Sequence, residues 1–445
     1  MPEFNEFKKI SSAEWKLKIQ SDLKGEDYST LITHTSEDID IKPFYHFDDF
    51  KKFKMLSGNS FVIVQELMIA NEKIANKIAL KSFSKGAETF RFIARKKFDF
   101  KQLTQQLDFS KLIFQLNFSD EDFFKKLYRF TKGKSVILLN PIGNLIKTGN
   151  WYINKNKDFE SLKNIQEFVP PDYPFIEVDV YHLLNAGATS SQQVAYALSQ
   201  AVDYWENLSN KSFPPLYFHF GIGSQYFMEI AKLKAFRVLW ELIAREYGVD
   251  THYKVYTKPG LRNKSLLDPY VNMLRTGMES MSAILGGTDY LSNLPYDIFF
   301  KKSNAFSERI ARNQLIILKE EAGFDKAMSA AEASYFLENL THDLARKSLD
   351  IFKTIEKGGG FTEQLYQGKI QEKISQQAAE EQQKFDEGKL VLVGVNKYVN
   401  EQDKLPEYEI FPFAKKRKGQ TLIPPVIAKR LAENTEKKIL EEKEN

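Results

Sequence analysis

The stretch PFIEVDVYHLLNAGATSSQQVAYALSQAVDYW, residues 174–205, predicts one strand followed by one helix. Residues 174–181 form a short apolar run rich in β-branched and aromatic side chains, which is typical of a buried strand. Asn185, Ala186 and Gly187 predict a tight loop, and the long segment after Thr189 predicts a helix. This strand-then-helix unit recurs along the chain and therefore decides the expected fold.

Seven further runs have the same character and complete a set of eight predicted strands. They are FVIVQEL (61–67), ETFRFIA (88–94), KLIFQLNF (111–118), SVILLNP (135–141), LYFHFGIG (216–223), HYKVYT (252–257) and TDYLSNL (288–294). Because most of them precede a helical pattern, we expect an α/β fold, a (β/α)8 TIM barrel. A doubly wound open sheet is the alternative, although no G-x-G-x-x-G or G-x-x-x-x-G-K follows any strand.

Segments outside the barrel pattern divide the chain into three predicted parts. Residues 1–35 are expected to be an N-terminal helical docking segment whose helix begins near Ser11 or Ser12. Residues 36–395 hold the TIM barrel and two further helical stretches. The run 390–398, which crosses the boundary with the last part, is expected to be extended. Residues 396–445 resemble a linker and are expected to form an extended arm. Its KKRK run (415–418) is either a solvated charge run or a patch for a polyanion.

Composition excludes several classes of function. The chain has 445 residues and a net charge of +4, from 63 basic and 59 acidic residues, which argues against a nucleic-acid partner. It contains no cysteine, so disulfides and thiolate metal sites are excluded. It has neither an N-terminal apolar signal region nor a run of about 18 apolar residues. We therefore expect a cytoplasmic protein that does not bind membranes.

Chemistry in a TIM barrel sits at the carboxyl ends of the strands. The residues predicted at those positions are Gln65, Glu66, Asn117, Asn140, His182, Phe220, Gly221, Tyr256, Thr257 and Asn293. Of these, Glu66 and His182 are suited to general acid–base work, and they belong to the first and fifth strands, on opposite sides of the barrel. The strands are also bulky on both faces, so we expect large side chains to fill the barrel.

The six histidines do not form a metal-binding motif. None has the spacing of H-E-x-x-H or of another ligand pair, so no metal site is expected. His219 falls inside a strand, where a core histidine is the expected role, and His342 is expected to lie on a helix as a surface or packing residue. His182 stays open as either a catalytic group or the remnant of one.

Several stretches together resemble the coenzyme B12-dependent methylmalonyl-CoA mutase family. YHLLNAGATSSQQVAYALSQAVDY is similar to its Y-H-x-x-E-A-G-A-T segment, and HFGIGSQYFMEIAKLKAFRVLW resembles its F-x-x-G-x-x-F-F-x-E-x-A-K-x-R-A-x-R-x-L-W segment. SERIARNQLIILKEEAGFDKAM is similar to its R-I-A-R-N-x-Q-x-I-L-x-E-E segment, and VGVNKY resembles the start of its linker. The resemblance covers roughly residues 11–400 and implies a TIM-barrel substrate domain.

Departures from the family pattern fall on the residues that the resemblance would make functional. Glu66 stands where catalytic chains have a tyrosine that drives cobalt–carbon homolysis, and Asn59 where they have a CoA-binding arginine. Small residues of the S-x-S-G-Y-H segment are replaced by Glu177, Asp179 and Val180, and the glutamate after the histidine is Asn185. His182 alone matches the reacting centre. Neither the proline-rich CoA-binding segment nor a cobalt-ligating D-x-H-x-x-G occurs.

The resemblance therefore implies a non-catalytic small subunit of a heterodimeric enzyme of this family. The partner, a catalytic large subunit, would bind adenosylcobalamin and interconvert methylmalonyl-CoA and succinyl-CoA, while this chain binds no cofactor and stabilises it. His182 would then be vestigial. The alternative is a substrate-domain chain that is active with a separate cobalamin-binding subunit, and a further one is a free-standing barrel with an unrelated ligand.

Overall fold

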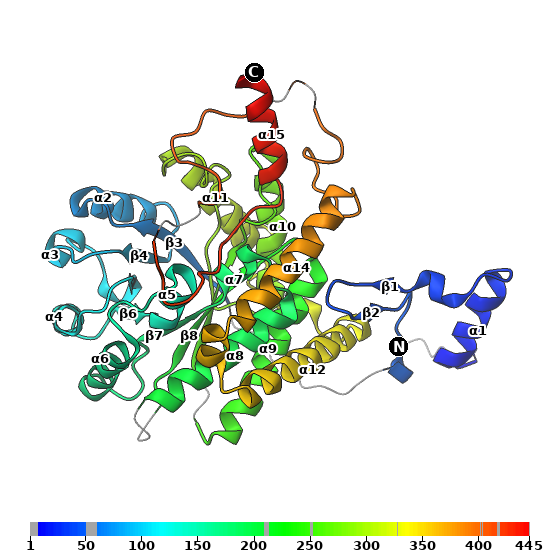
Figure 1. Cartoon of the computed structure of the whole chain (residues 1–445), viewed down its shortest axis with the longest axis horizontal. Coiled ribbons are helices and arrows are strands. Elements are labelled where there is room, and N and C mark those ends of the chain that lie inside the picture. The colour runs from blue at the N-terminus through cyan, green and yellow to red at the C-terminus, as the bar shows by residue number, and fades with distance from the viewer. Residues whose placement is uncertain are drawn as a thin grey trace.

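A closed barrel of eight parallel strands organises the chain in this computed structural model (Figure 1). The structure describes residues 8–49, 60–208, 213–249, 252–326, 328–400, 402, 404–415 and 419–444. The barrel strands are β3 (Val62–Met68), β4 (Thr89–Ala94), β5 (Leu112–Leu116), β6 (Val136–Leu139), β7 (Ile176–Asp179), β8 (Leu216–Ile222), β9 (Tyr253–Pro259) and β10 (Tyr290–Leu291). They pair in chain order, and β10 closes onto β3. The predicted TIM barrel and its eight strands are confirmed.

Helices follow the strands and surround the barrel. They are α2 (Glu72–Phe83), α3 (Phe100–Leu103), α4 (Glu121–Thr131), α5 (Pro141–Thr148), α6 (Lys155–Phe168), α7 (Tyr181–Ala186), α8 (Ser190–Asn207), α9 (Tyr226–Glu246), α10 (Val271–Leu285) and α11 (Ala305–Ile316). Asn185 and Ala186, predicted in a loop, end the short helix α7, which stops at Gly187 with φ +106°. Thr189 and Gln192 then form the capping box that starts α8.

Strand alternation sends the large aromatic rings outward, toward the helices. Phe90 of β4 packs against Phe83 of α2, with ring centroids 6.1 Å apart, and Phe218 of β8 packs against Phe236 of α9 at 4.6 Å. At the amino-terminal end of the strands the barrel interior is apolar and contains Ile113, Leu138, Tyr217, Val136 and Tyr290. The prediction that bulky apolar side chains fill the barrel is therefore correct only for this lower layer.

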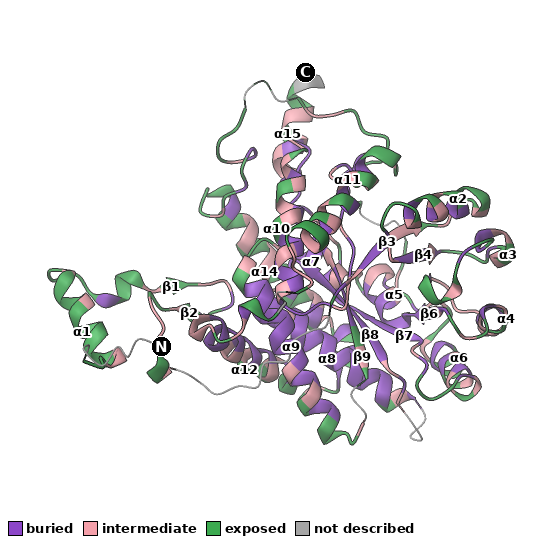
Figure 2. Cartoon of the chain, turned by 180° about the vertical axis from the view of Figure 1, so that it is seen from behind, coloured by how far each residue is buried: buried purple, intermediate pink, exposed green. Residues whose placement is uncertain are grey.

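The N-terminal segment stands away from the barrel, as Figures 1 and 2 show. Helix α1 (Ser12–Asp22) begins at the predicted position, where Ser11 and Glu14 form a capping box, and it buries no residue. A small hairpin follows, made of β1 (Thr33–His34) and β2 (Asp40–Ile41). Its turn is anchored by Glu37, whose carboxylate accepts hydrogen bonds from the first two amides of α8.

Three helices and an arm follow the barrel. Helices α12 (Tyr335–Lys357), α13 (Phe361–Tyr366) and α14 (Lys369–Asp386) pack beside it, and α15 (Glu433–Glu444) ends the described chain. The prediction of an extended run at 390–398 is wrong, because the chain turns back on itself at Gly394 (φ +78°) and pairs Val393 with Lys397. In the part of the chain that the structure describes, no helix has the length and apolarity to cross a membrane.

Candidate functional site: a charged layer under a covered barrel mouth

Charged side chains fill the upper layer of the barrel interior. Strand register places Glu66 of β3 beside Arg91 of β4, and Asp179 of β7 beside His219 of β8. Arg91 forms an ion pair with the Glu177 carboxylate at 2.5 Å, and its side chain is 1% exposed. The lumen is therefore occupied by the chain's own ion pairs where a substrate would otherwise lie.

Glu66 is fixed as an anion by two cations. Its carboxylate lies 2.6 Å from Lys258 Nζ and 3.4 Å from Arg91 Nε. Burial alone would raise the pKa of Glu66, but Lys258 and Arg91 outweigh burial and lower this pKa to about 2. A carboxylate with so low a pKa is a poor general base near neutral pH, which removes the acid–base role that the sequence allowed.

Arg91 and His219 are held by aromatic rings as well as by charges. The guanidinium of Arg91 lies 4.6 Å from the centroid of the Tyr256 ring, and its Nη2 donates to Gln115 Oε1 at 2.8 Å. His219 stacks on Tyr181 with ring centroids 4.9 Å apart and planes 3° from parallel. These contacts make the charged layer a packed structure as well as an electrostatic one.

His219 is neutral in this layer. Burial lowers the pKa of His219 to about 3, although Asp179 opposes the shift. Asp179 itself has a lowered pKa: burial would raise it, but the charge of the nearby Lys147 outweighs that effect. Glu177 has a raised pKa because burial outweighs its attraction to Arg91. The predicted core role of His219 agrees with its position, 5% exposed inside the barrel.

His182 is bound by the C-terminal arm. Its Nε2–H donates to the backbone carbonyl of Val426, in the C-terminal arm, at 2.7 Å. Lys258 instead bridges the region, because its Nζ binds Glu66 and lies 4.7 Å from the centroid of the Tyr181 ring. The two acid–base candidates from the sequence are thus engaged by different partners.

The remaining predicted residues have packing or capping contacts. Gln65 and Asn293 face outward and contact α11, where Gln65 Nε2 donates to Glu308 and Asn293 Nδ2 donates to Gln314 Oε1. Asn140 caps α5. The others have these contacts: Asn117 accepts a hydrogen bond from Gln115, the Phe220 ring packs on Phe236, the Gly221 carbonyl accepts a hydrogen bond from Lys232, the Tyr256 hydroxyl is hydrogen-bonded to Ser292, and the Thr257 hydroxyl donates to Thr288.

The other predicted residues come from other parts of the sequence. His342 contacts Asp343 on α12, as expected of a helix-surface residue. Asn59 and residues 416–418 of the KKRK run lie outside the described residues.

Sequence reasoning missed Arg91, Lys258 and Lys147. The signal for Arg91 was available, because in FRFIA the flanking phenylalanines face outward and strand alternation then turns the arginine inward. Lys258 follows the same rule in YKVYTK. Lys147 lies on α5 and pairs with Asp179, a contact that depends on how the helix packs and that no strand pattern contains.

A cavity of about 720 Å³ lies beside the barrel mouth. Its walls include Gly223 and Gly260, at the ends of β8 and β9, and Leu274 and Met278 of α10. The N-terminal hairpin and residues 389–393 complete it. This cavity is therefore next to the position where TIM barrels carry ligands, but outside the charged lumen.

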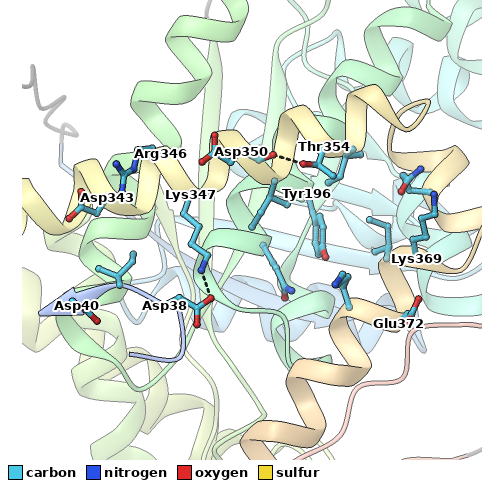
Figure 3. Close-up of a pocket in the computed structure, with 17 residues that line it drawn as sticks. Asp38, Asp40, Tyr196, Asp343, Arg346, Lys347, Asp350, Thr354, Lys369 and Glu372 are labelled. Atoms are coloured by element: carbon cyan, nitrogen blue, oxygen red, sulfur yellow. Dashed lines mark hydrogen bonds and ion pairs between the residues drawn. The ribbon is translucent and has the colours of Figure 1, made fainter. Parts of the chain in front are cut away.

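A second groove, of about 1060 Å³, lies between the N-terminal hairpin and helices α8, α12 and α14 (Figure 3). Lys347 of α12 and Asp38 of the hairpin form an ion pair across it at 2.5 Å. Tyr196 of α8 and Lys369 of α14 also line it. None of its lining residues belongs to a barrel strand, which separates it from the barrel mouth.

Comparison with known proteins places this barrel in an enzyme family. The methylmalonyl-CoA mutase family model matches residues 128–442. The "Methylmalonyl-CoA mutase small subunit" of Porphyromonas gingivalis is 28% identical over 89% of this chain and 71% of its own length. The fold and the match define a TIM barrel of the mutase class. The chain belongs to the methylmalonyl-CoA mutase family.

Other relatives match a smaller part of the chain. The "Methylmalonyl-CoA mutase" of Cereibacter sphaeroides is 36% identical over 51% of this chain and 34% of its own length. The "Methylmalonyl-CoA mutase large subunit" of Propionibacterium freudenreichii subsp. shermanii is 34% identical over 51% of this chain and 33% of its length. This chain thus aligns with about a third of each. A dihydropteroate synthase from Thermus thermophilus aligns at 14% identity, covers 59% of this chain and 94% of its own, and has a TM-score of 0.34.

The family depends in general on cobalamin. No set of three or more His, Asp or Glu side chains in the described part of the chain is arranged to hold a metal ion. His182, in the helix that follows β7, donates its Nε2–H to the arm. The same arm crosses the carboxyl-terminal mouth of the barrel.

Proposed function

We propose that this chain is the non-catalytic small subunit of a heterodimeric methylmalonyl-CoA mutase. Its partner, a catalytic large subunit, binds adenosylcobalamin and interconverts methylmalonyl-CoA and succinyl-CoA, and this chain stabilises it. The observation that carries the proposal is the ion-pair layer in the lumen, where Arg91 and Glu177 are almost completely buried. The small-subunit name of the Porphyromonas gingivalis relative, which covers most of this chain, also supports it.

Removing that layer to admit a substrate is unfavourable. A buried ion pair that loses one partner leaves an uncompensated charge, which costs about 3–5 kcal/mol. Arg91 is shared between Glu66 and Glu177, so a substrate that displaced it would leave two buried carboxylates without this cation. The binding free energy of an acyl-CoA would have to offset the cost of these uncompensated charges. This requirement supports the proposal that the barrel is not catalytic.

The N-terminal segment supplies the docking element of the proposal. Helix α1 buries no residue within its own chain, and Leu17 is 70% and Trp15 47% exposed. Figure 2 shows the segment as a mostly exposed projection from the barrel. Exposed apolar side chains on a projecting helix are typical of a surface that a protein partner covers. We assign the catalytic large subunit as that partner.

Reconstitution tests the proposal. The purified chain is mixed with adenosylcobalamin and a protein that carries only a cobalamin-binding domain, and separately with a full catalytic large subunit, and mutase turnover is measured. We expect a stable complex and turnover only with the large subunit. Turnover with the cobalamin-domain protein would contradict the proposal and support the alternative of a chain that is itself active.

A further inference from the structure

The C-terminal arm crosses the mouth of the barrel as an extended segment, residues 421–431. In Figure 1 this arm runs in red from α15 past α7 to α5. Its backbone amides donate to carbonyls of three segments that follow barrel strands. Ile423 N donates to Gly149 O at 3.1 Å and Val426 N to Ile146 O at 2.9 Å, both in the segment after β6. Lys429 N donates to Asn185 O, after β7, and Leu431 N donates to Arg262 O, after β9.

Side chains complete these backbone contacts. Arg262 Nη1 donates to the Lys429 carbonyl at 2.9 Å, and Gln371 Nε2 of α14 donates to the Pro424 carbonyl at 3.3 Å. Ile423 and Val426 are 2% and 6% exposed and belong to the main hydrophobic core. The segment is therefore bound to the barrel over its full length.

The far end of the segment is joined to α15 by a buried ion pair, and both members of this pair also hydrogen-bond to the loop after β9. Arg430 pairs with Glu436 of α15 at 2.6 Å, and the Glu436 carboxylate accepts the Leu266 amide at 2.8 Å. Arg430 Nη1 also donates to the Lys264 carbonyl at 3.1 Å. At the other end, Gly149 has φ +76°, and a Cβ there would lie 2.4 Å from the Ile423 carbonyl oxygen. A glycine at this position lets the segment approach α5 closely.

We propose that residues 421–431 are a strap that closes the carboxyl-terminal mouth of the barrel, and that His182 is its latch. His182 meets the strap midway along its length, where its Nε2–H donates to Val426 O while the Val426 amide donates to Ile146 O. Val426 is thus held by the barrel on both of its backbone groups. His182 is a positioning residue in this account, and its place after β7 serves the closure of the mouth.

The strap separates two regions of the chain. Below it lies the charged layer with Asp179, which Lys147 of α5 reaches from the same helix that binds the strap. Outside it, Leu422 and Ile427 are 58% and 47% exposed. The strap is held by a row of hydrogen bonds and by four buried side chains, those of Ile423, Val426, Arg430 and Leu431. Because none of these residues belongs to a barrel strand, the strap can detach locally while the barrel strands remain paired.

Hydrogen–deuterium exchange of the full-length chain tests the strap directly. In the unaltered protein we expect the amides of Ile423, Val426, Lys429 and Leu431 to be protected. In His182→Ala we expect the Val426 and Ile423 amides to exchange about fivefold faster, the factor that the loss of one neutral hydrogen bond implies. Amides of β8 should be unchanged, which shows that the barrel is intact.

Two further variants sharpen the test. His182→Gln keeps a donor at about the reach of Nε2 and should restore most of the protection. His342→Ala, which removes a histidine from α12, serves as the matched control and should leave the strap amides unchanged. The proposal is overturned if strap amides of the unaltered protein exchange as fast as those of an unfolded peptide. It is also overturned if the Val426 and Ile423 amides of His182→Ala exchange at the same rate as in the unaltered protein, or if the amides of β8 become equally faster to exchange.

Discussion

Replacing Glu66 with glutamine should lower the stability of the fold in a pH-dependent way. The pKa of Glu66 is about 2 in the folded chain, against 4.5 for an ordinary glutamate. A difference of roughly 2.5 pKa units corresponds to about 3 kcal/mol at 1.36 kcal/mol per unit. This figure already contains the lost attraction of Lys258 and Arg91, and it agrees with the loss of about 3–5 kcal/mol expected at pH 7 when one partner of a buried ion pair is removed.

The sign of the pH dependence follows from the lowered pKa. A carboxylate whose pKa is lower in the folded state contributes its full stability above the unfolded pKa, and loses it as the pH falls toward the folded pKa. The difference between the unaltered chain and Glu66→Gln should therefore be constant from pH 7 to about 4.5, and should narrow progressively toward pH 2.

Urea unfolding followed by tryptophan fluorescence at several pH values measures this difference. Glu160→Gln, which neutralises an exposed carboxylate on α6, is the control and should change the free energy of unfolding by less than about 0.5 kcal/mol. A loss below about 1 kcal/mol at pH 7, or a difference that does not narrow between pH 4.5 and the acid limit, would refute the ion-pair account of the lumen.

Other parts of the chain give four further predictions. Arg91→Met should destabilise the chain by about 3–5 kcal/mol, and adding Glu177→Gln should recover part of that loss, as measured by urea unfolding with the exposed Arg95→Met as control. Burial, together with the nearby Asp203 and Glu206, raises the pKa of Glu356 to about 7. The free energy of unfolding should therefore fall as the pH rises from about 4.5 through 7, because Glu356 ionises more readily in the unfolded chain. Glu356→Gln should then raise the melting temperature at pH 8 and leave it unchanged at pH 4, and an equal effect at both would contradict this. Leu17→Glu should weaken binding to the catalytic large subunit at least tenfold in a titration, while Lys18→Glu on the same helix should not; equal affinities would exclude α1 from the interface. In the assembled enzyme, His182→Ala should change kcat less than about threefold, against the roughly 10²–10⁴-fold expected for a working acid–base group, and a loss above about a hundredfold would show that His182 is catalytic.

The barrel was predictable from sequence because each strand carries its own local signal. Runs such as LYFHFGIG and PFIEVDVY are apolar, short and followed by a helix pattern, and the structure confirms all eight. The last strand shortens to Tyr290–Leu291, because pairing with two neighbours decides where a strand ends, and the sequence of one run does not contain that information.

The candidate site was less predictable because its contacts join distant parts of the chain. Lys258 reaches Glu66 across 192 positions, and His182 reaches the Val426 carbonyl across 244. The side of the barrel on which each residue lies follows from alternation, but the partner that it meets does not. Sequence reasoning therefore found Glu66 and His182 but missed the residues that they contact. Glu66 is paired with Lys258 and Arg91, and His182 is hydrogen-bonded to the strap.

Equilibrium binding of methylmalonyl-CoA to the purified chain, measured by isothermal titration calorimetry, tests the closed and charge-filled barrel most directly. The account predicts no saturable binding at ligand concentrations up to about 1 mM. The binding free energy of any interaction would then be less favourable than about −4 kcal/mol. Saturable binding with a micromolar Kd, abolished by a substitution inside the lumen such as Tyr256→Ala, would contradict it.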